Sequence, residues 1–208
     1  MPRKMAASNK YHDDLLEGAT IKELVKVMLE KSGYVVYPYG YEGPFTDVRK
    51  KLTDTETKNS KTVRRIRSCP DLLVYDETEK DLFLVEVKMR RAPKETKVLI
   101  YQKLIANYKE FWSESILVVI VPCGKVFYAQ RISELEAKEE YDATTEFLRL
   151  EEFFCRVSEE DLAHFREKAL WIMEKKGKFE SHAEELHLMK KSFSCSQNTE
   201  NGAIEKLQ

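Results

Sequence analysis

The chain has 208 residues, of which 42% are hydrophobic and 34% are charged, and its formal net charge is −1. This length provides one domain of ordinary size with a substantial core. The longest apolar run, residues 116–122, is much shorter than a membrane span, which argues against a helical membrane protein. No apolar segment follows the basic residues 1–10, so we expect a cytoplasmic protein without a signal peptide.

The four cysteines are far apart and form no CxxC pair: Cys69, Cys123, Cys155 and Cys195. Zinc sites need clustered ligands, and thiols of cytoplasmic proteins are normally reduced. The cysteines therefore predict reduced thiols, and we expect a packing role for Cys69.

The first predicted element is a helix over Asp13–Lys31, preceded by a flexible basic N-terminus of residues 1–12. Its apolar stripe consists of Ile21, Leu24, Val25, Met28 and Leu29. Gly33 is suited to end this helix, and Tyr34–Tyr37 predicts a strand.

Residues 38–62 are rich in Gly, Pro, Thr, Asp and Lys, which predicts a long basic loop inserted into the core. Val63–Arg67 would form an extended lead-in to the next strand. Four aromatic residues lie at the end of this strand and in the loop: Tyr37, Tyr39, Tyr41 and Phe45. Such rings could stack on bases, although we favour packing as their role.

Two segments, residues 68–76 and 81–88, each contain an apolar run, are separated by a polar turn and predict a hairpin. Side chains alternate between the faces of a strand, so Glu86 and Lys88 share one face. Asp71, at the start of the partner strand, can approach Glu86. Charged groups in apolar strands are costly unless they are paired or bind a metal.

A pair of carboxylates in this position is suited to metal-assisted hydrolysis of a phosphodiester. Mg²⁺ prefers oxygen ligands and keeps several waters, and it activates a bound water and a phosphoryl oxygen. Lys88 would neutralise charge on the phosphate and orient the attacking water.

The remaining elements continue the same pattern. An amphipathic helix is predicted over Lys97–Trp112, followed by strands at Ser115–Val121 and Lys125–Gln130. Residues 132–176 predict a C-terminal helical appendage, with short helices over 133–138 and 145–154 and a longer one from Ser158 to Lys176. Residues 177–208 read as a mostly flexible tail.

Pro70-Asp71 followed by Glu86-Val87-Lys88 resembles the active-site motif of the PD-(D/E)xK nuclease superfamily, which includes restriction enzymes and archaeal Holliday junction resolvases. The resemblance implies an α/β fold with a restriction-endonuclease-like αβββαβ core over residues 13–131, a central mixed sheet flanked by helices. It implies Asp71, Glu86 and the Val87 carbonyl as metal ligands and Lys88 as a catalytic residue. The cofactor would be Mg²⁺, with Mn²⁺ able to substitute.

The resemblance also implies two accessory residues. A glutamate of the first helix often joins the metal site in this superfamily, and Glu17 is preferred over Glu23 because it lies nearer the apolar stripe. Glu23 lies nearer the usual distance before the Gly-Tyr pair, and neither need bind metal. Gln102 resembles a glutamine that often reaches the site, although a surface position is an equal alternative.

Basic residues flank the motif in sequence. Between Arg49 and Arg67 there are eight Lys or Arg residues and two acidic ones, and a second cluster follows Lys88. Such cations contact nucleic-acid phosphates, whereas the alternative is a solvated charged loop. The predicted nucleic-acid-binding residues are Arg49, Lys50, Lys51, Lys61, Arg64, Arg65, Arg67, Arg90 and Arg91.

Three hypotheses follow. The first is a metal-dependent nuclease, expected to be an endonuclease, acting on DNA. The second is a catalytically silent nuclease-like module that binds nucleic acid, or a subunit of a larger complex. The third is a domain in which Asp71, Glu86 and Lys88 form a structural ion-pair network. The motif does not distinguish DNA from RNA, and a homodimer remains open because the apolar face of residues 162–173 could pack within the chain or against a second copy.

Overall fold

The computed structural model describes residues 3–40, 60–89 and 96–174, with side chains from residue 16 onward. Ile21–Met173 form one compact unit, and Met1–Thr20 with Glu174–Gln208 form another. The sheet and the candidate site belong to the first unit. Within the described part of the chain, no helix combines the length and the apolar character needed to cross a bilayer.

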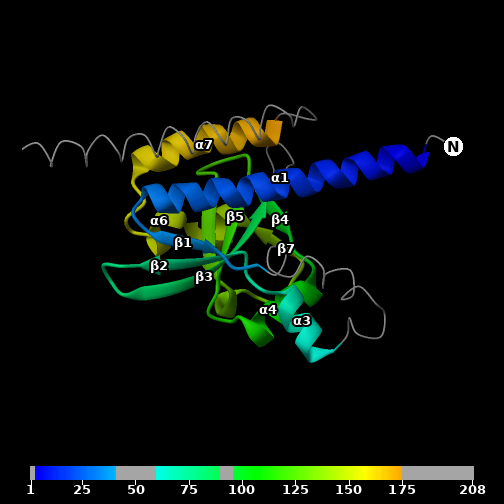
Figure 1. Ribbon diagram of the computed structural model, residues 1–208, viewed down its shortest axis with the longest axis horizontal. Helices are drawn as coiled ribbons and strands as arrows, with labels where there is room; N and C mark the ends of the chain where they lie inside the picture. Colours follow the sequence, from blue (N-terminus) through cyan, green and yellow to red (C-terminus); the bar gives the residue numbers. More distant parts are fainter. Residues whose placement is uncertain (1–2, 41–59, 90–95, 175–208) are drawn as a thin grey trace, which may run out of the picture. The chain divides into compact units, whose positions relative to one another are not determined.

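The central element is a six-stranded mixed sheet with the order β1-β2-β3-β5-β6-β8 (Figure 1). Its strands are β1 (Val35–Pro38), β2 (Leu72–Asp76), β3 (Asp81–Met89), β5 (Ile116–Ile120), β6 (Phe127–Arg131) and β8 (Leu148–Arg149). β3 and β5 are parallel, and the other neighbours are antiparallel. A separate two-stranded sheet pairs β4 (Lys97–Leu99) with β7 (Glu140–Asp142).

The helices are α1 (Arg3–Lys31), α3 (Lys61–Arg67), α4 (Gln102–Phe111), α5 (Ala143–Glu146), α6 (Leu150–Phe153) and α7 (Glu159–Glu174), with a 3₁₀ turn, η1 (Ile132–Glu134). A parallel pair needs a crossover connection, and α4 lies within the connection from β3 to β5. The order α1-β1-β2-β3-α4-β5 is the predicted αβββαβ core. The α/β fold class with a mixed central sheet is confirmed.

The two sides of the sheet are covered by different helices. Leu117 and Val119 of β5 belong to a buried cluster that contains Ile105 and Tyr108 of α4. Val118 points to the opposite side and is fully buried. Figure 1 shows α7 and the second half of α1 along that side. The predicted apolar stripe of α1 is buried, as expected.

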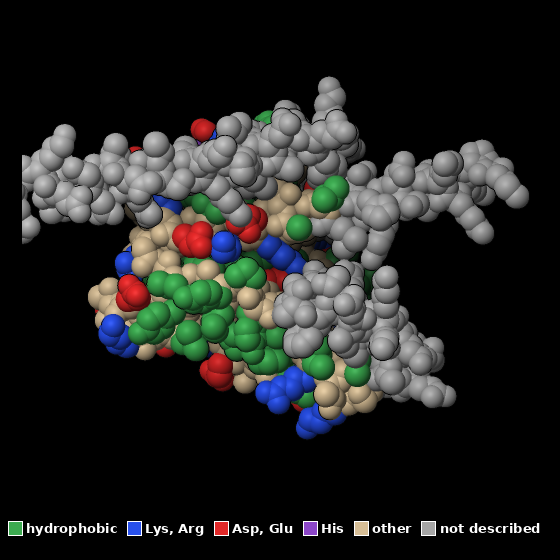
Figure 2. Space-filling model, viewed as in Figure 1, with side chains coloured by type: hydrophobic (Ala, Val, Ile, Leu, Met, Phe, Trp, Pro, Cys, Tyr) green, Lys and Arg blue, Asp and Glu red, His purple; other side chains and the backbone are tan. Residues whose placement is uncertain are grey.

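One part of the sheet is less covered. Tyr37, Leu73 and Leu84 lie opposite one another on β1, β2 and β3, and none of the three is buried. Figure 2 shows apolar side chains gathered over these strands. The antiparallel part of the sheet thus carries an apolar face that α4 does not reach.

The segment before β2 is a helix, so the predicted extended lead-in at Val63–Arg67 is wrong. Ser60 caps α3, because its Oγ accepts a hydrogen bond from the Val63 N–H at 3.2 Å. Packing of Arg64 and Arg65 on α4, described below, holds this short helix in place. A local run of β-branched and basic residues does not reveal such tertiary anchors.

Two further boundaries differ from the predictions. α1 begins at Arg3 instead of Asp13, and residues 97–99 form β4 instead of the first turn of a helix. Val98 and Ile100 are buried, and β4 pairs with β7, a segment 40 residues away that no local pattern connects to it. α4 therefore starts only at Gln102.

The prediction that the region after β6 is purely helical is wrong. This region contains β7, and it contains β8, whose Leu148 pairs with Ala129 and extends the main sheet. The helices in this region are single turns, except for α7.

The long helix α7 packs within the chain. Leu162, Phe165, Ala169 and Ile172 are all buried, which confirms packing against the core as the role of this face. Ser158 caps the helix, because its Oγ accepts a hydrogen bond from the Asp161 N–H at 3.1 Å. This face is therefore not available to a second copy of the chain, and the homodimer stays a prediction for which no interface is identified.

Candidate metal and phosphodiester site

Strand β3 places Glu86 and Lys88 on the side of the sheet that faces α4. Glu86 lies opposite Leu117 and Lys88 opposite Val119, both members of the cluster around α4. The Lys88 ammonium donates a hydrogen bond to Oε1 of Glu86. The predicted sharing of one face is thus confirmed.

Asp71 reaches β3 through its side chain. β2 begins at Leu72, which pairs with Val85, so the pairing of the two strands ends just before Asp71. Its Oδ2 accepts a hydrogen bond from the Val87 N–H at 3.0 Å. In a strand, the N–H and C=O of one residue point to the same neighbouring strand, so the Val87 carbonyl is directed past the end of β2.

The backbone at Asp71 is held in place by the segment after β1. The N–H groups of Tyr39 and Gly40 both donate to the Asp71 carbonyl, at 2.9 and 3.2 Å. These bonds extend the β1–β2 pairing beyond its last strand residue. The Asp71 carboxylate is therefore positioned by three segments, β1, β2 and β3.

The charge state of Glu86 is set mainly by burial. The side chain is 2% exposed, and this desolvation raises its pKa to about 6. The charge of Asp71 raises the pKa further, whereas Lys88 lowers it. The Tyr108 phenol, close to the Glu86 carboxylate, also lowers this pKa, although Oε2 of Glu86 is buried without a hydrogen bond of 3.5 Å or less to a described residue. A buried carboxylate oxygen in this condition is costly and is suited to a cation.

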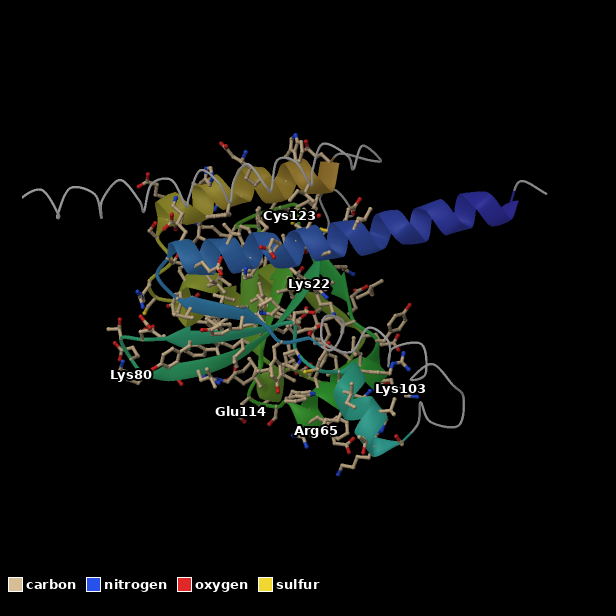
Figure 3. The ribbon with its side chains drawn as sticks, viewed as in Figure 1. Lys22, Arg65, Lys80, Lys103, Glu114 and Cys123 are labelled. Atoms are coloured by element: carbon tan, nitrogen blue, oxygen red, sulfur yellow. The ribbon has the colours of Figure 1, made fainter. Side chains whose placement is uncertain are left out.

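Two residues at the site were not singled out from the sequence. Lys22 of α1 forms an ion pair with Oδ1 of Asp71, at 2.6 Å, and Figure 3 shows where it leaves the helix. Tyr108 of α4, predicted only as part of an apolar stripe, lies beside Glu86, and burial followed by the charge of Glu86 raises the pKa of its phenol. Neither residue has a local signal, because both reach the site only when helix and sheet pack.

Cys69 lies close to both carboxylates. Burial, and then the charges of Glu86 and Asp71, raise the pKa of its thiol to about 11. The thiol therefore stays protonated and unreactive at neutral pH. This agrees with a packing role.

The residues fit a hard divalent cation in their chemistry. Asp71 and Glu86 supply carboxylate oxygens, Oε2 of Glu86 among them, and the Val87 carbonyl is a further oxygen donor, the type that Mg²⁺ prefers. Within residues 16–40, 60–89 and 96–174, no cluster of three or more His, Cys, Asp or Glu side chains forms a complete metal site. The protein would thus supply few ligands and leave several positions to water, as is common for Mg²⁺.

The accessory candidates lie in different places. α1 continues through Gly18, and Glu17 is 6% exposed, but Glu17 belongs to the unit of residues 1–20, so its part in the site stays a prediction. Glu23 is half-buried and pairs with Lys26 at 3.5 Å. Gln102 is exposed and donates to the Ala137 carbonyl at 3.5 Å, so its amide is directed toward the segment after η1.

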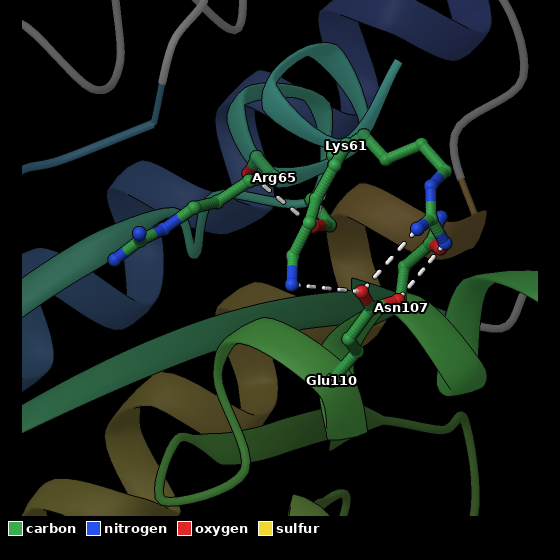
Figure 4. A network of polar contacts seen from close by, with 6 residues as sticks. Lys61, Arg65, Asn107 and Glu110 are labelled. Atoms are coloured by element: carbon green, nitrogen blue, oxygen red, sulfur yellow. Dashed lines mark hydrogen bonds and ion pairs between the residues drawn. The ribbon is translucent and has the colours of Figure 1, made fainter. Parts of the chain in front are cut away.

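The predicted basic residues that the structure describes gather on α3. Arg64 donates two hydrogen bonds to Glu110, at 2.9 and 3.3 Å, and one to Asn107, and Lys61 lies 3.8 Å from Glu110 (Figure 4). The guanidinium of Arg65 lies over the Trp112 ring, at 5.3 Å. These contacts anchor α3 to α4 and neutralise part of its charge.

The other predicted binding residues are distributed as follows. Arg67 lines a cavity between α3 and α4. Arg49, Lys50, Lys51, Arg90 and Arg91, with the aromatic residues Tyr41 and Phe45, lie outside the described residues. Tyr39 packs edge-on against Trp112, at 6.2 Å between ring centroids, as the packing interpretation predicted.

Comparisons with known proteins give one structural likeness to report. No family model matches the chain, and no curated protein matches it significantly. Among solved structures, the chain is similar to Hjc, a Holliday junction resolvase from the archaeal hyperthermophile Archaeoglobus fulgidus. The TM-score is 0.42 and the identity 16%, and the match covers 65% of this chain and 93% of that one. The case for a function therefore rests on the residues of the site.

Proposed function

We propose that this chain is a metal-dependent nuclease that hydrolyses phosphodiester bonds in DNA, most simply as an endonuclease. The observation that carries the proposal is that the Asp71 carboxylate accepts a hydrogen bond from the Val87 N–H, the residue next to Glu86, while Lys88 donates to the Glu86 carboxylate. A buried glutamate, a partly buried aspartate and a lysine at the end of a strand pairing serve no packing purpose that apolar residues would not serve better.

Each residue has a role in this proposal. Asp71, Glu86 and the Val87 carbonyl hold the cation, and Lys88, half-exposed beside Glu86, contacts the scissile phosphate and orients the attacking water. A bound Mg²⁺ or Mn²⁺ would lower the pKa of a coordinated water and polarise the phosphoryl oxygen. Glu17 and Gln102 are proposed as accessory residues.

Lys22 adds a second ammonium to the site. In the structure each carboxylate has its own lysine, Lys22 for Asp71 and Lys88 for Glu86. The two cations balance the buried negative charge before a substrate arrives. Two ammonium groups at the same place are then available to a phosphate.

The same pairing favours a second candidate function. If both lysines hold the carboxylates permanently, the site is a closed ion-pair network, and the chain is a silent nuclease-like module that binds nucleic acid or a subunit of a larger complex. The buried Oε2 of Glu86, without a partner among the described residues, weighs against a closed network.

A cleavage assay separates the two candidates. Labelled single-stranded, duplex and branched DNA, and RNA, are incubated with the full chain in Mg²⁺, Mn²⁺ or EDTA, beside Glu86→Gln. The matched control is Glu77→Gln, an exposed glutamate in the β2–β3 turn. Cleavage by the wild type and by Glu77→Gln that needs the metal and is lost in Glu86→Gln supports the nuclease. Binding without cleavage in every metal supports the silent module, and cleavage by Glu86→Gln overturns the site.

A further inference from the structure

A cavity of about 460 Å³ lies between α3 and the N-terminal half of α4, within the unit Ile21–Met173. Arg64 and Arg67 of α3 line it on one side, and Tyr101, Lys103 and Asn107 line it on the other. The volume is within the range of small-ligand sites, about 300–1,000 Å³. The metal-site residues Asp71, Glu86 and Lys88 do not line it.

The charges around the cavity favour an anion. Among the described residues that line it, three are cationic and none is acidic. Arg64 is already engaged by Glu110, at 2.9 Å, whereas Arg67 and Lys103 form no ion pair with any residue that the structure describes. Figure 3 shows Lys103 beside α3. Two uncompensated cations at one opening are suited to a phosphate group.

Polar groups suited to a base are present as well. Arg64 Nη1 donates to Oδ1 of Asn107, at 3.1 Å, which fixes the orientation of the amide. Because its oxygen is taken, the Asn107 amide offers its NH₂ group as a donor. Such amide donors recognise acceptors on base edges.

Tyr101 adds an aromatic surface. Its side chain is 83% exposed, although a tyrosine ring of this size is usually partly covered. Aromatic rings at the opening of a basic groove are the common platform on which unpaired bases stack. A base in a duplex is already stacked on both sides and cannot use this ring.

The cavity lies close to the candidate cleavage site along the chain. Ser68, which also lines the cavity, is three residues before Asp71. Three residues span at most about 11 Å even when fully extended, which corresponds to about three nucleotides of a strand. The cavity wall at Ser68 thus lies within about three nucleotides of Asp71.

We propose that this cavity binds one unpaired nucleotide of the substrate strand, with its base stacked on Tyr101 and its phosphate held by Arg67 and Lys103. The inference rests on the proposed nuclease function for the identity of the strand. It specifies the substrate class, which is nucleic acid with an unpaired nucleotide next to the cleavage position instead of continuous duplex.

The test measures binding separately from cleavage. Fluorescence anisotropy of labelled oligo(dT), and of its duplex with oligo(dA), is followed with the full chain in EDTA. Tyr101→Ala should weaken single-strand binding by about 5- to 150-fold and leave the duplex unaffected, whereas Tyr101→Phe should retain affinity. The matched control is Tyr37→Ala, which removes a tyrosine that is 56% exposed on β1. Equal losses in Tyr101→Ala and Tyr37→Ala, or no loss in Tyr101→Ala, would overturn the site.

Salt dependence tests the phosphate contact. Arg67→Ala and Lys103→Ala should each reduce the slope of log affinity against log salt by about 0.7 for a single strand. Lys109→Ala, on the same helix but outside the cavity lining, should leave the slope unchanged. Unchanged slopes in both cavity variants would exclude the phosphate contact.

Two further outcomes keep the alternatives apart. Tighter binding of deoxythymidine monophosphate than of oligo(dT) would indicate a free-nucleotide site and overturn the strand assignment. A Tyr101-dependent affinity without any cleavage by the wild type would refute the nuclease and leave the nucleotide site standing. Metal-dependent cleavage with unaltered affinity in Tyr101→Ala would do the reverse, and absence of both binding and cleavage would refute both.

Discussion

An aspartate lies beside a cation at each end of strand β2. The two aspartates differ in the hydrogen bonds that compensate their charge. At one end, Oδ1 of Asp76 accepts hydrogen bonds from the Thr78 and Glu79 N–H groups and from Arg156, at 2.8, 3.3 and 3.0 Å. At the other end, Asp71 meets Lys22 and the Val87 N–H, beside the buried Glu86. The Asp76–Arg156 contact resembles a structural ion pair in which the aspartate has all its hydrogen-bond partners within the protein.

The pKa shifts point in opposite directions at these two ends. Hydrogen bonds from Thr78, Glu79 and Arg156 outweigh desolvation and hold the pKa of Asp76 below its ordinary value of 3.8. Desolvation outweighs Lys88 and raises the pKa of Glu86 above 4.5. A carboxylate with a structural role is satisfied by its surroundings, whereas Glu86 is left short of positive charge. This difference argues against the structural ion-pair hypothesis for the Asp71 end.

The largest expected effect separates the two aspartates by activity. Asp71→Asn should reduce metal-dependent cleavage by about 10²–10³-fold or more, because a metal ligand is lost and several kcal/mol of transition-state stabilisation with it. Asp76→Asn should leave cleavage close to wild type at a temperature where both variants are folded. Initial rates in Mg²⁺ measure this, and comparable losses in the two variants would erase the distinction.

A second prediction concerns the stability of the metal-free protein. The folded-state pKa of Glu86 is raised, so the folded protein binds the proton more tightly than the unfolded chain does. The resulting penalty is absent below about pH 4.5, grows as the pH rises to about 6 and is complete above it. In EDTA at pH 8, Glu86→Gln should therefore be more stable than the wild type, by on the order of 2 kcal/mol.

Urea unfolding at several pH values measures this difference. The stabilisation should vanish near pH 4, and Mg²⁺ should stabilise the wild type but not Glu86→Gln. A wild type that is already as stable as the variant at pH 8 in EDTA would mean that Lys88 fully compensates the buried charge.

At the other end of β2 the sign is reversed. The pKa of Asp76 is lowered, so its contribution to stability is present at neutral pH and is lost as the pH falls below about 4. Asp76→Asn should lower the melting temperature at pH 7 by about 4 °C and reduce the loss of stability on acidification. Asp81→Asn, directly opposite on β3 and exposed, is the matched control. Thermal melts from pH 7 to pH 3 would contradict the idea if both variants behaved alike.

An effect of about the same size probes how Arg156 is held. Gly33 ends α1 at φ +86°, and a Cβ there would lie 2.2 Å from Nη2 of Arg156. Gly33→Ala should destabilise the protein by about 1–2 kcal/mol, through the left-handed backbone and displacement of Arg156 from Asp76. In the Asp76→Asn background, Gly33→Ala should lower the unfolding free energy by less, because the contact between Arg156 and Asp76 is already weakened. Strict additivity of the two unfolding free energies would show that Arg156 moves without cost.

The local sequence pattern was sufficient to predict the core helices and strands and the placement of Glu86 and Lys88 on one face of β3. Glu86 and Lys88 share a face because strand side chains alternate, and this holds whatever packs on the strand. The apolar stripes of α1 and α7 could likewise be predicted from the sequence, since helical spacing fixes which residues are buried together. These features depend only on residues close in the chain.

Other features depended on distant segments. Residues 97–99 form a strand because β7 pairs with them, and Lys61–Arg67 form a helix because Glu110 and Trp112 hold its arginines. Lys22 and Tyr108 reach the carboxylates only through the packing of α1 and α4 on the sheet. No local propensity encodes these partners, because each contact joins segments tens of residues apart.

The sequence by itself thus determined the αβββαβ order, the buried faces and the positions of Asp71, Glu86 and Lys88 on neighbouring strands, because periodicity and turn residues act locally. Only the tertiary structure decided the charge state of Glu86, the pairing of Asp71 with Lys22 and the cavity between α3 and α4. Burial and ion pairing are set by what the whole fold brings around a side chain, and so they emerge only when the chain has packed.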